Sequence, residues 1–251
     1  MKKNREAVEE LKKILEETEN LVFFGGAGTS TESSIPDFRS KDEGLYSRGG
    51  KQDYPPEIIL SHSFFLKHPK IFYQYYWDNL VHEKAKPNRG HYALAALEEQ
   101  GKLKAVITQN VDGLHQKAGS RKVYELHGSI HRNYCMECHE EYSFEELLKN
   151  RGKVPACNKC QGIIRPAVTL YEEPLNLSVI EGAIAAIEQA EVLIVGGTSL
   201  VVYPAAGFLE YFQGKKLIII NREKTPRDHR ADLVIQGSIG EILAEAVGIE
   251  E

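Results

Sequence analysis

The chain has 251 residues, of which 42% are hydrophobic, and it carries a formal net charge of −5. A chain of this size can form one substantial domain with a smaller insertion, each with its own buried core. Its net charge gives no general attraction to nucleic acid or to an anionic membrane. The first residues, MKKNREAVEELKK, are too charged for the apolar part of a secretory signal, and no apolar run reaches the roughly 18 residues that span a bilayer. We therefore expect a soluble, cytoplasmic protein without a membrane partner.

Apolar residues in the first 15 positions recur at helical spacing, which predicts an amphipathic N-terminal helix. Short apolar runs rich in β-branched residues follow at residues 21–24, 104–108, 122–126, 192–197, 216–220 and 233–236. Helical patterns separate several of these runs, for example at residues 90–101 and 179–190. Continuous apolar strands that alternate with helices are typical of a parallel sheet covered on both faces. We predict an α/β protein with a Rossmann-like, doubly wound parallel sheet.

Two segments depart from this alternation. Residues 41–85 are rich in aromatic residues and proline, and residues 131–164 contain all four cysteines. We predict that both are insertions that form a second, smaller lobe. The remaining residues, 1–40, 86–130 and 165–251, are then expected to form the main α/β domain.

The cysteines form two C-x-x-C pairs, Cys135 with Cys138 and Cys157 with Cys160, separated by 18 residues. This spacing is typical of four thiolates that hold one structural Zn²⁺, and a closed four-thiolate site leaves no open position for catalysis. The alternatives are two disulfides, which the cytosol disfavours, and a redox C-x-x-C, which would not explain the matched second pair. A nucleic-acid-binding ribbon is a further alternative. However, basic and acidic residues are interspersed in this segment, so we expect no direct nucleic-acid binding.

The segment GGAGTSTESSIPDFRS, residues 25–40, directly follows the first apolar run. Gly26 and Gly28 supply a G-x-G, at which backbone can approach a pyrophosphate near a helix N-terminus, although a tight turn explains the glycines equally well. Arg39 is a fixed cation suited to a phosphate or a carboxylate, and Phe38 offers a flat apolar wall. The alternative for Arg39 is a surface ion pair. The segment lacks the lysine of a nucleotide-hydrolysing loop.

Polar clusters also follow other strands. TQNVDGLH (108–115) offers amides and a carboxylate, and GGTSLVVYPAAG (196–207) offers glycines and hydroxyls. His127, directly after a strand, is suited to general-base work near neutral pH, and Asn221 and Glu223 are suited to a ribose. Turn residues or a histidine that caps a strand explain each cluster singly. Together, at the strand ends of one sheet, they indicate a large nucleotide site.

The ordered segments of this chain resemble those of the sirtuins of bacterial type, a family of NAD-dependent protein lysine deacylases. The segments are GAGTSTESSIPDFRS, TQNVDGLH, ELHGS, the two C-x-x-C pairs, GTSLVVYP and INREKT. The resemblance runs from about Leu21 to the C-terminus. It implies that residues 1–40, 86–130 and 165–251 form a Rossmann-type NAD-binding domain. It also implies a small lobe made of a helical module, residues 41–85, and a metal-binding module for zinc, residues 131–164. NAD and an acylated lysine would meet between the domain and the lobe.

The resemblance also implies residue roles. His127 would be the general base and also contact NAD, and Asn110 would help catalysis by positioning water. The other implied NAD contacts are Ala27, Thr31, Phe38 and Arg39 in the first loop, Gln109, Val111 and Asp112 around the nicotinamide and its ribose, and Thr198, Ser199, Asn221 and Ile239 around the phosphates and adenosine. A substrate peptide would pair as a strand with Val168, Thr169, Leu170 and Tyr171. The four cysteines would hold the structural zinc.

The implied reaction consumes NAD as a co-substrate. The acyl carbonyl oxygen of an acylated lysine attacks the ribose and nicotinamide leaves. His127 then helps to deprotonate a ribose hydroxyl that attacks the acyl group, which gives free lysine and acyl-ADP-ribose. The implied partners are acetylated lysine side chains of proteins. The rival interpretations are an NAD-dependent protein ADP-ribosyltransferase and a non-catalytic module that binds NAD or nucleic acid.

The chain departs from the family pattern at two places. The family usually has Phe-Gly-Glu where this chain has Tyr171, Glu172 and Glu173. Members that remove acidic acyl groups carry a Tyr and an Arg in the helical module, and the aligned positions here are Tyr76 and Asn79. Without the cation, a buried succinyl carboxylate would lack a partner at a cost of several kcal/mol, so we expect an uncharged acyl group such as acetyl. We interpret the aromatic run at residues 72–77 mainly as core packing.

Overall fold

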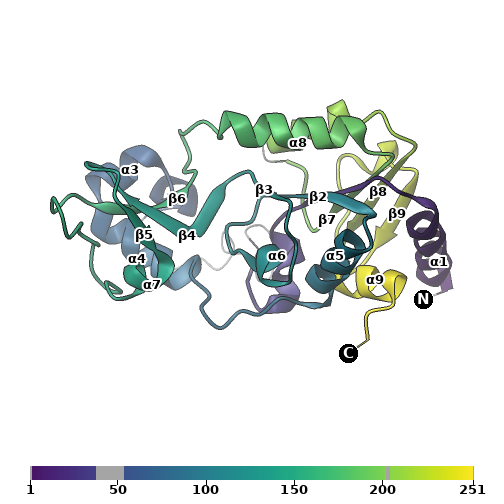
Figure 1. Cartoon of the computed structure of the whole chain (residues 1–251), viewed down its shortest axis with the longest axis horizontal. Helices are drawn as coiled ribbons and strands as arrows, with labels where there is room; N and C mark the ends of the chain where they lie inside the picture. Colours follow the sequence, from purple (N-terminus) through teal and green to yellow (C-terminus); the bar gives the residue numbers. More distant parts are fainter. Residues whose placement is uncertain (1, 38–53, 202–203, 251) are drawn as a thin grey trace.

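Parallel strands form the central sheet of the large lobe in the computed structural model, which describes residues 2–37, 54–201 and 204–250 (Figure 1). The strand order is β3-β2-β1-β7-β8-β9. The strands are β1 (Leu21–Gly25), β2 (Leu103–Thr108), β3 (Val123–Glu125), β7 (Val192–Gly196), β8 (Lys216–Asn221) and β9 (Leu233–Gln236). Each predicted apolar run supplies one of these strands, which confirms the Rossmann-like core.

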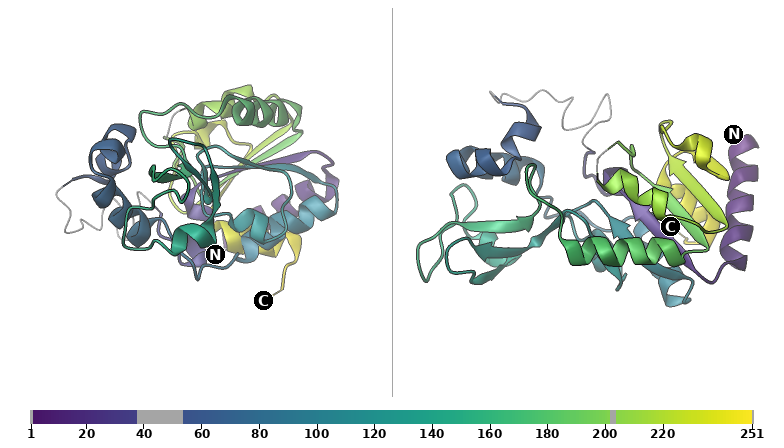
Figure 2. Two further views of the ribbon diagram at one scale, coloured as in Figure 1. Left: turned by 60° about the vertical axis from the view of Figure 1, so that its left-hand side comes forward. Right: turned by 90° about the horizontal axis from the view of Figure 1, so that it is seen from above.

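Helices cover both faces of this sheet (Figure 2). The helices α1 (Lys2–Glu17), α5 (Arg89–Glu99) and α9 (Ile239–Val247) cover one face, and α8 (Leu177–Gln189) with the 3₁₀ helix η3 (Ala205–Tyr211) covers the other. The shorter helices α6 (Leu114–Lys117), η1 (Ala27–Thr29), η2 (Thr31–Ser33) and η4 (Asp228–Arg230) lie in the connections between strands. Helix α5 begins where the side chain of Asn88 accepts the N–H groups of Gly90 and His91, which satisfies donors that lack a partner within the helix. Across the described ranges, no helix is long and apolar enough to cross a bilayer.

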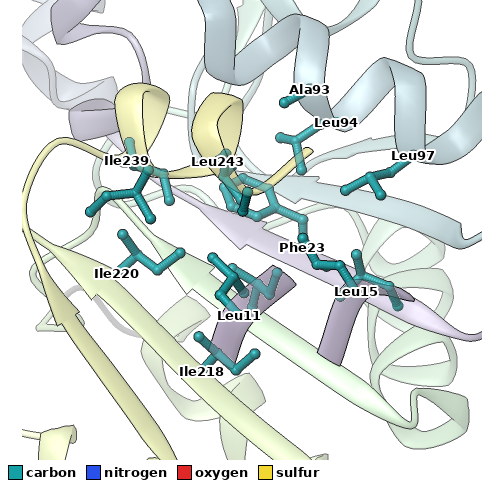
Figure 3. Close-up of a cluster of buried hydrophobic side chains, with 14 of the residues drawn as sticks. Leu11, Leu15, Phe23, Ala93, Leu94, Leu97, Ile218, Ile220, Ile239 and Leu243 are labelled. Carbon is teal, nitrogen blue, oxygen red and sulfur yellow. The ribbon is translucent and has the colours of Figure 1, made fainter. Parts of the chain in front are cut away.

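Each face of the sheet has its own apolar core because alternate residues of a strand point to opposite sides. Phe23 of β1 packs with Ile218 and Ile220 of β8 against the apolar stripes of α1, α5 and α9 (Figure 3). Val22 and Phe24 belong to the opposite core, which α8 and η3 cover. All five residues of β1 are buried, as expected for a central parallel strand.

The small lobe contains an antiparallel sheet in the order β5-β4-β6 (Figure 1). Its strands are β4 (Gly128–Cys135), β5 (Glu141–Ser143) and β6 (Ile164–Val168), and its helices within the described residues are α2 (Pro56–Ile59), α3 (His62–Lys67), α4 (Pro69–Asn79) and α7 (Phe144–Leu148). The sheet therefore extends a few residues beyond the predicted metal-binding module of residues 131–164. The residue ranges given for the two lobes stay a prediction.

The aromatic run at residues 72–77 forms the core of the small lobe. The aromatic side chains of this run are buried, most of their ring contacts are edge to face, and Phe65 of α3 joins them. The hydroxyl group of Tyr73 donates a hydrogen bond to the carbonyl oxygen of Ile164, which ties α4 to β6. This packing confirms the interpretation of the run as core.

Two buried histidines, His91 of α5 and His115 of α6, lie edge to face with ring centroids 4.7 Å apart. Nδ1 of His91 accepts the backbone N–H of Asn88 at 3.2 Å. Among the described residues, Nε2 of His91 and both ring nitrogens of His115 have no hydrogen-bond partner. Burial lowers the pKa of His91 to about 4, and burial together with the neighbouring His91 lowers the pKa of His115 well below its usual range. Both rings are therefore neutral in the folded protein at neutral pH.

We predict that the free energy of unfolding decreases as the pH falls from about 6.5 toward 4, because the unfolded chain then binds protons that the buried rings do not. Each ring contributes up to about 1.4 kcal/mol per pH unit in this window. His115→Leu should therefore reduce the slope of stability against pH, whereas His229→Gln at an exposed position should leave it unchanged. Urea unfolding between about pH 4.5 and 7.5 measures the slope. An equal slope for His115→Leu and the wild type would contradict the prediction.

Candidate active site

The loops after β1 and β7 lie in direct contact at the carboxyl edge of the large sheet. The strand order reverses between these two strands, and open α/β sheets bind ligands in the crevice at such a reversal. The N–H of Gly28 donates to the carbonyl oxygen of Gly197 at 2.8 Å, and a Cβ on Gly28 would lie 2.7 Å from the Cα of Gly197. Gly197 also has a φ of +59°, in the left-handed region. Both positions therefore require glycine.

A cavity of about 1300 Å³ opens at this edge and extends to the small lobe. It exceeds the roughly 300–1,000 Å³ of a typical small-molecule site, so it has room for two ligands. The predicted site residues that line it are Ala27, Thr31, Gln109, Asn110, Val111, Asp112, His127, Val168, Thr169, Leu170, Tyr171, Thr198, Ser199, Asn221 and Ile239. Phe38 and Arg39 lie outside the described residues. Residues predicted from separate segments are thus brought to one cavity, while their individual roles stay predictions.

Ser30, which the sequence did not single out, joins two of the predicted residues. Nδ2 of Asn110 donates to Ser30 Oγ and to Thr29 Oγ1, at 3.0 Å in each case. Ser30 Oγ in turn donates to Oδ2 of Asp112 at 2.7 Å. Burial raises the pKa of Asp112, although its hydrogen bonds from the N–H of Leu114 and from Ser30 oppose this shift. The chain of hydrogen bonds fixes the orientation of the Asn110 amide beside the cavity.

His127 lies between β3 and β4, with Nδ1 2.9 Å from the carbonyl oxygen of Gln109. Because a carbonyl only accepts, Nδ1 carries the proton, and Nε2 of the neutral ring is left as the basic nitrogen. Burial lowers the pKa of His127, and the bond to Gln109 partly opposes this. Gln109 also donates from Nε2 to Thr198 Oγ1 at 3.1 Å, so it joins the loops after β2 and β7. The arrangement supplies a neutral, oriented base at the cavity wall.

The far end of the cavity is bounded by the loop after β8 and the start of α9. Asn221 donates from Nδ2 to the carbonyl oxygen of Glu223 at 2.9 Å, which holds its side chain within the turn. Glu32, another residue that the sequence did not single out, accepts the N–H of Gly240 at 3.0 Å. Because Gly240 lies in the first turn of α9, this bond fastens the first glycine loop to the N-terminus of that helix.

The chain that leaves β6 lines the cavity next to His127 and then passes to the helices of the small lobe. The N–H of Thr169 donates to the carbonyl oxygen of His127 at 2.9 Å. Tyr171 donates to the carbonyl oxygen of Leu60 and accepts the N–H of His62, both at 3.0 Å. These N–H donors are already bonded. The carbonyl oxygens of Val168, Leu170 and Tyr171 also accept one bond each, so an incoming peptide strand would have to pair through the carbonyl oxygen of Thr169 or through the remaining lone pairs.

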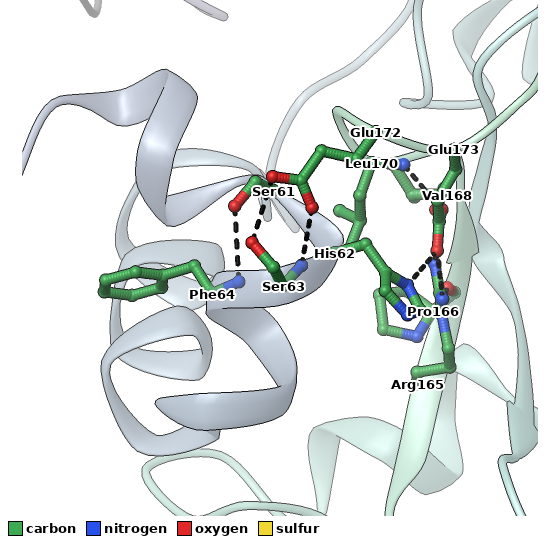
Figure 4. Close-up of polar contacts among 10 residues, drawn as sticks. All are labelled: Ser61, His62, Ser63, Phe64, Arg165, Pro166, Val168, Leu170, Glu172 and Glu173. Carbon is green, nitrogen blue, oxygen red and sulfur yellow. Dashed lines mark hydrogen bonds and ion pairs between the residues drawn. The ribbon is translucent and has the colours of Figure 1, made fainter.

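An ion pair between buried Arg165 and partly buried Glu173 supports this segment (Figure 4). The guanidinium of Arg165 contacts both carboxylate oxygens of Glu173, at 2.6 and 3.0 Å, and also donates to the carbonyl oxygen of Val168 at 2.9 Å. Glu173 further accepts the N–H of Leu170 at 2.8 Å and lies 2.6 Å from Nδ1 of His62. Burial alone would raise the pKa of Glu173, but the bonds from Arg165 and Leu170 hold it below its usual range. No pattern in the sequence indicated this network.

Tyr76 and Asn79 are the positions that align with the Tyr and Arg of members that remove acidic acyl groups, and their surroundings differ. Asn79 lines the cavity and donates from Nδ2 to the carbonyl oxygen of Tyr75 at 3.0 Å. Tyr76 is fully buried in the aromatic core and is absent from the described lining of the cavity. Among the described lining residues, Arg222 at the β8 end is the only Lys or Arg. The small-lobe side of the cavity therefore offers a buried carboxylate no described Lys or Arg partner.

The four cysteines form a cluster at the end of β4 and in the loop that precedes β6. Their Sγ atoms all lie within 4.8 Å of one another, with Cys135 and Cys160 at 3.4 Å and Cys138 and Cys157 at 3.6 Å. A tetrahedron with Zn–S bonds of about 2.3 Å has edges of about 3.8 Å, so the cluster fits one zinc ion. None of these cysteines is among the described residues that line the cavity. The zinc is therefore structural.

Comparisons with known proteins agree with this arrangement. A model of the Sir2 family matches residues 26–204. The chain is 56% identical over 240 residues to an NAD-dependent protein deacetylase of Clostridium acetobutylicum, an alignment that covers 96% of this chain and 98% of the relative. A solved structure of Sir2Tm bound to a propionylated peptide has 38% identity and a TM-score of 0.84, with 96% of this chain and 99% of that chain covered. A Sir2 complex with a p53 peptide and NAD+ has 39% identity and a TM-score of 0.82, with 96% and 98% covered.

We predict that the purified protein contains one zinc ion per chain and that removal of the metal unfolds the small lobe, since the binding free energy of a structural zinc contributes directly to folding. Cys138→Ala should have the same effect, whereas Glu141→Ala, an exposed change in the same module, should not. Metal analysis combined with thermal melts before and after chelation measures both effects. A metal-free protein that melts like the zinc-loaded form would count against a structural zinc.

Proposed function

This chain belongs to the Sir2 family, and we propose that its cavity is the site at which it acts as an NAD-dependent protein deacetylase. The enzyme transfers the acyl group of an acylated lysine to the ADP-ribose of NAD and releases nicotinamide. One observation supports the location of the reaction in this cavity. The glycine loops at the strand-order reversal, His127 and the chain after β6 all line the same cavity of about 1300 Å³. Both substrates can therefore meet within it.

The loop after β1 would hold the pyrophosphate of NAD through its backbone. Gly26 and Gly28 allow close approach of a ligand, and Thr31 and Ser199 add hydroxyl groups at the cavity wall. We propose that Asn221 and Ile239 contact the adenosine half, and that Phe38 and Arg39 contribute as the family resemblance implies. No lysine or magnesium ligand is required because the pyrophosphate is bound and not cleaved.

NAD supplies an electrophilic ribose carbon, which the acyl carbonyl oxygen attacks as the bond to nicotinamide breaks and its electron pair leaves with nicotinamide. We propose that Nε2 of His127 then accepts the proton of a ribose hydroxyl as that oxygen attacks the acyl carbon. The bond from Nδ1 to Gln109 keeps the other ring nitrogen protonated, and burial keeps the ring neutral. Addition of water completes the release of free lysine and acyl-ADP-ribose.

Asn110 and Asp112 would orient the groups that react. Both are joined through Ser30, so neither side chain has to be ordered when the substrates bind. We propose that Asn110 positions the water, and that Gln109, Val111 and Asp112 surround the nicotinamide and its ribose. Closure of the cavity around the two substrates would exclude other water from the electrophilic carbon.

The peptide that carries the acylated lysine would lie along Val168, Thr169, Leu170 and Tyr171. The carbonyl oxygens of this segment can accept hydrogen bonds from an extended peptide, as in strand addition. Its position beside His127 brings the acylated side chain toward the base. The partners are therefore acylated lysine side chains of proteins, and the absence of direct nucleic-acid binding stays a prediction.

We further propose that the protein works in the cytoplasm. Its cysteines are free thiols gathered at a zinc site, and reducing compartments keep thiols in this state. A metal-thiolate cluster, unlike a disulfide, is compatible with the glutathione pool of a cytosol.

We predict that His127→Ala lowers the rate of peptide deacetylation by roughly 10²–10⁴-fold, the usual contribution of a general base. NAD binding and the fold should be retained, since the base acts only after nicotinamide has left. The control is His229→Ala, at an exposed position. Deacetylation followed by mass spectrometry of the peptide measures the effect, and near-wild-type turnover by His127→Ala would remove the assignment. ADP-ribose attached to the protein, in place of free acyl-ADP-ribose, would instead identify an ADP-ribosyltransferase.

We predict that acetyl and propionyl peptides are turned over at least about a hundredfold faster than the succinyl peptide of the same sequence. The small-lobe side of the cavity presents no described Lys or Arg to a carboxylate, and an unpaired buried charge costs several kcal/mol. The kcat/KM values for the three peptides at saturating NAD measure this preference. Comparable values for the succinyl and acetyl peptides would show that a cation reaches the acyl group.

A further inference from the structure

Glu172 has a backbone conformation that side chains with a Cβ rarely adopt. Its φ is +76°, in the left-handed region that glycine occupies most easily. A glycine would fit this turn without strain, whereas a glutamate does not. A residue that persists in a disfavoured conformation is held there by other contacts.

The contacts of Glu172 come from helix α3 (Figure 4). One carboxylate oxygen accepts the backbone N–H of Ser63 at 2.9 Å, and the other accepts the hydroxyl of Ser63, also at 2.9 Å. Ser63 lies in the first turn of α3, where N–H groups have no partner within the helix. Both carboxylate oxygens therefore bond to the same residue, one of them to an N–H that the helix leaves without a partner.

The position of Glu172 makes this contact relevant to the peptide. It directly follows Tyr171, whose backbone already pairs with Leu60 and His62 on either side of Ser61. The Arg165–Glu173 ion pair holds the same segment from its buried side. Glu172 therefore adds an attachment on the exposed side, and the segment of residues 168–173 is fastened between β6 and α3.

We propose that Glu172 is a positioning residue: its carboxylate clamps the segment of residues 168–173 onto α3 so that the backbone is already in place when the acyl-lysine peptide binds. This inference rests on the proposed function for the role of the segment. A preformed backbone lowers the entropic cost of peptide binding, whereas the chemistry at NAD and His127 takes place elsewhere in the cavity. The clamp therefore acts on the KM for the peptide.

Variants of Glu172 test the proposed clamp better than variants of Glu173. The Arg165 side chain is only 7% exposed, so loss of Glu173 would leave a buried charge unpaired and endanger the fold. The bonds of Glu172 to Ser63 lie at the exposed surface, so its variants should remain folded. Three replacements separate its properties: Glu172→Ala removes the clamp and keeps a Cβ, Glu172→Gly removes the clamp and fits the turn, and Glu172→Gln keeps an acceptor without the charge.

The experiment measures kcat and KM for an acetylated peptide, KM for NAD, and backbone hydrogen exchange at Ser63 and Tyr171. For Glu172→Ala and Glu172→Gly we expect the peptide KM to rise by about tenfold, with kcat and the KM for NAD within about twofold of wild type. Exchange at the Ser63 amide should become faster in both. Glu172→Gln should restore most of the peptide affinity and of the amide protection. Glu188→Ala, which removes an exposed charge at the far end of α8, serves as the control and should change none of these values.

Wild-type peptide KM and wild-type exchange in Glu172→Ala and Glu172→Gly would overturn the clamp. A Glu172→Gln variant as impaired as Glu172→Ala would overturn it as well, because the charge and not the bonded acceptor would then be responsible. If the wild-type protein showed no NAD-dependent deacetylation, the proposed function would fail. The exchange rates at Ser63 and Tyr171 would still decide whether Glu172 fixes the segment.

Discussion

Gly28 and Gly197 lie in backbone contact because the two strands that precede them are neighbours at the point where the strand order reverses. A side chain at either position would push the loops apart. Their contact brings Ser30 within reach of Asn110 and Asp112, and brings Thr198 within reach of Gln109. The hydrogen bond from Nδ1 of His127 to the carbonyl oxygen of Gln109 then orients the ring that we propose as the base. The geometry of the reacting groups therefore follows from one close approach of two loops.

The small lobe forms the other side of the cavity, and other kinds of interaction hold it in place. The hydroxyl of Tyr73 joins the aromatic helix α4 to β6. The ion pair of Arg165 and Glu173 fastens the chain after β6 to that strand, and Glu173 reaches α3 through His62. The cysteine cluster lies at the end of β4 and in the loop before β6, and a bound zinc stabilises these loops. Ion pair and aromatic core thus hold the chain after β6 beside His127, and we propose that catalysis depends on this support although the zinc takes no part in it.

Much of this arrangement can be predicted from local patterns in the sequence. Buried parallel strands require continuous apolar runs, and a tetrahedral thiolate site requires paired cysteines, so the sheet and the zinc cluster could be predicted. Polar residues at the strand ends indicated the cavity, because the carboxyl ends of parallel strands meet at one edge of the sheet. The contacts of Ser30 with Asp112 and of Glu32 with Gly240 join residues 82 and 208 positions apart, and nothing in one sequence tells which distant side chains meet. The burial of Tyr76 likewise depends on which face α4 turns to the core.

The central claim is that one cavity brings the ribose of NAD and the acyl oxygen of a lysine into contact, with His127 next to both. A crystal structure of the protein with an acetyl-lysine peptide and a non-cleavable NAD analogue tests this most directly. The account predicts an acyl oxygen about 3–3.5 Å from the ribose carbon that bears nicotinamide, and His127 Nε2 within hydrogen-bond reach of a ribose hydroxyl. Ligands bound in separate places, or a His127 ring turned away from the ribose, would contradict it.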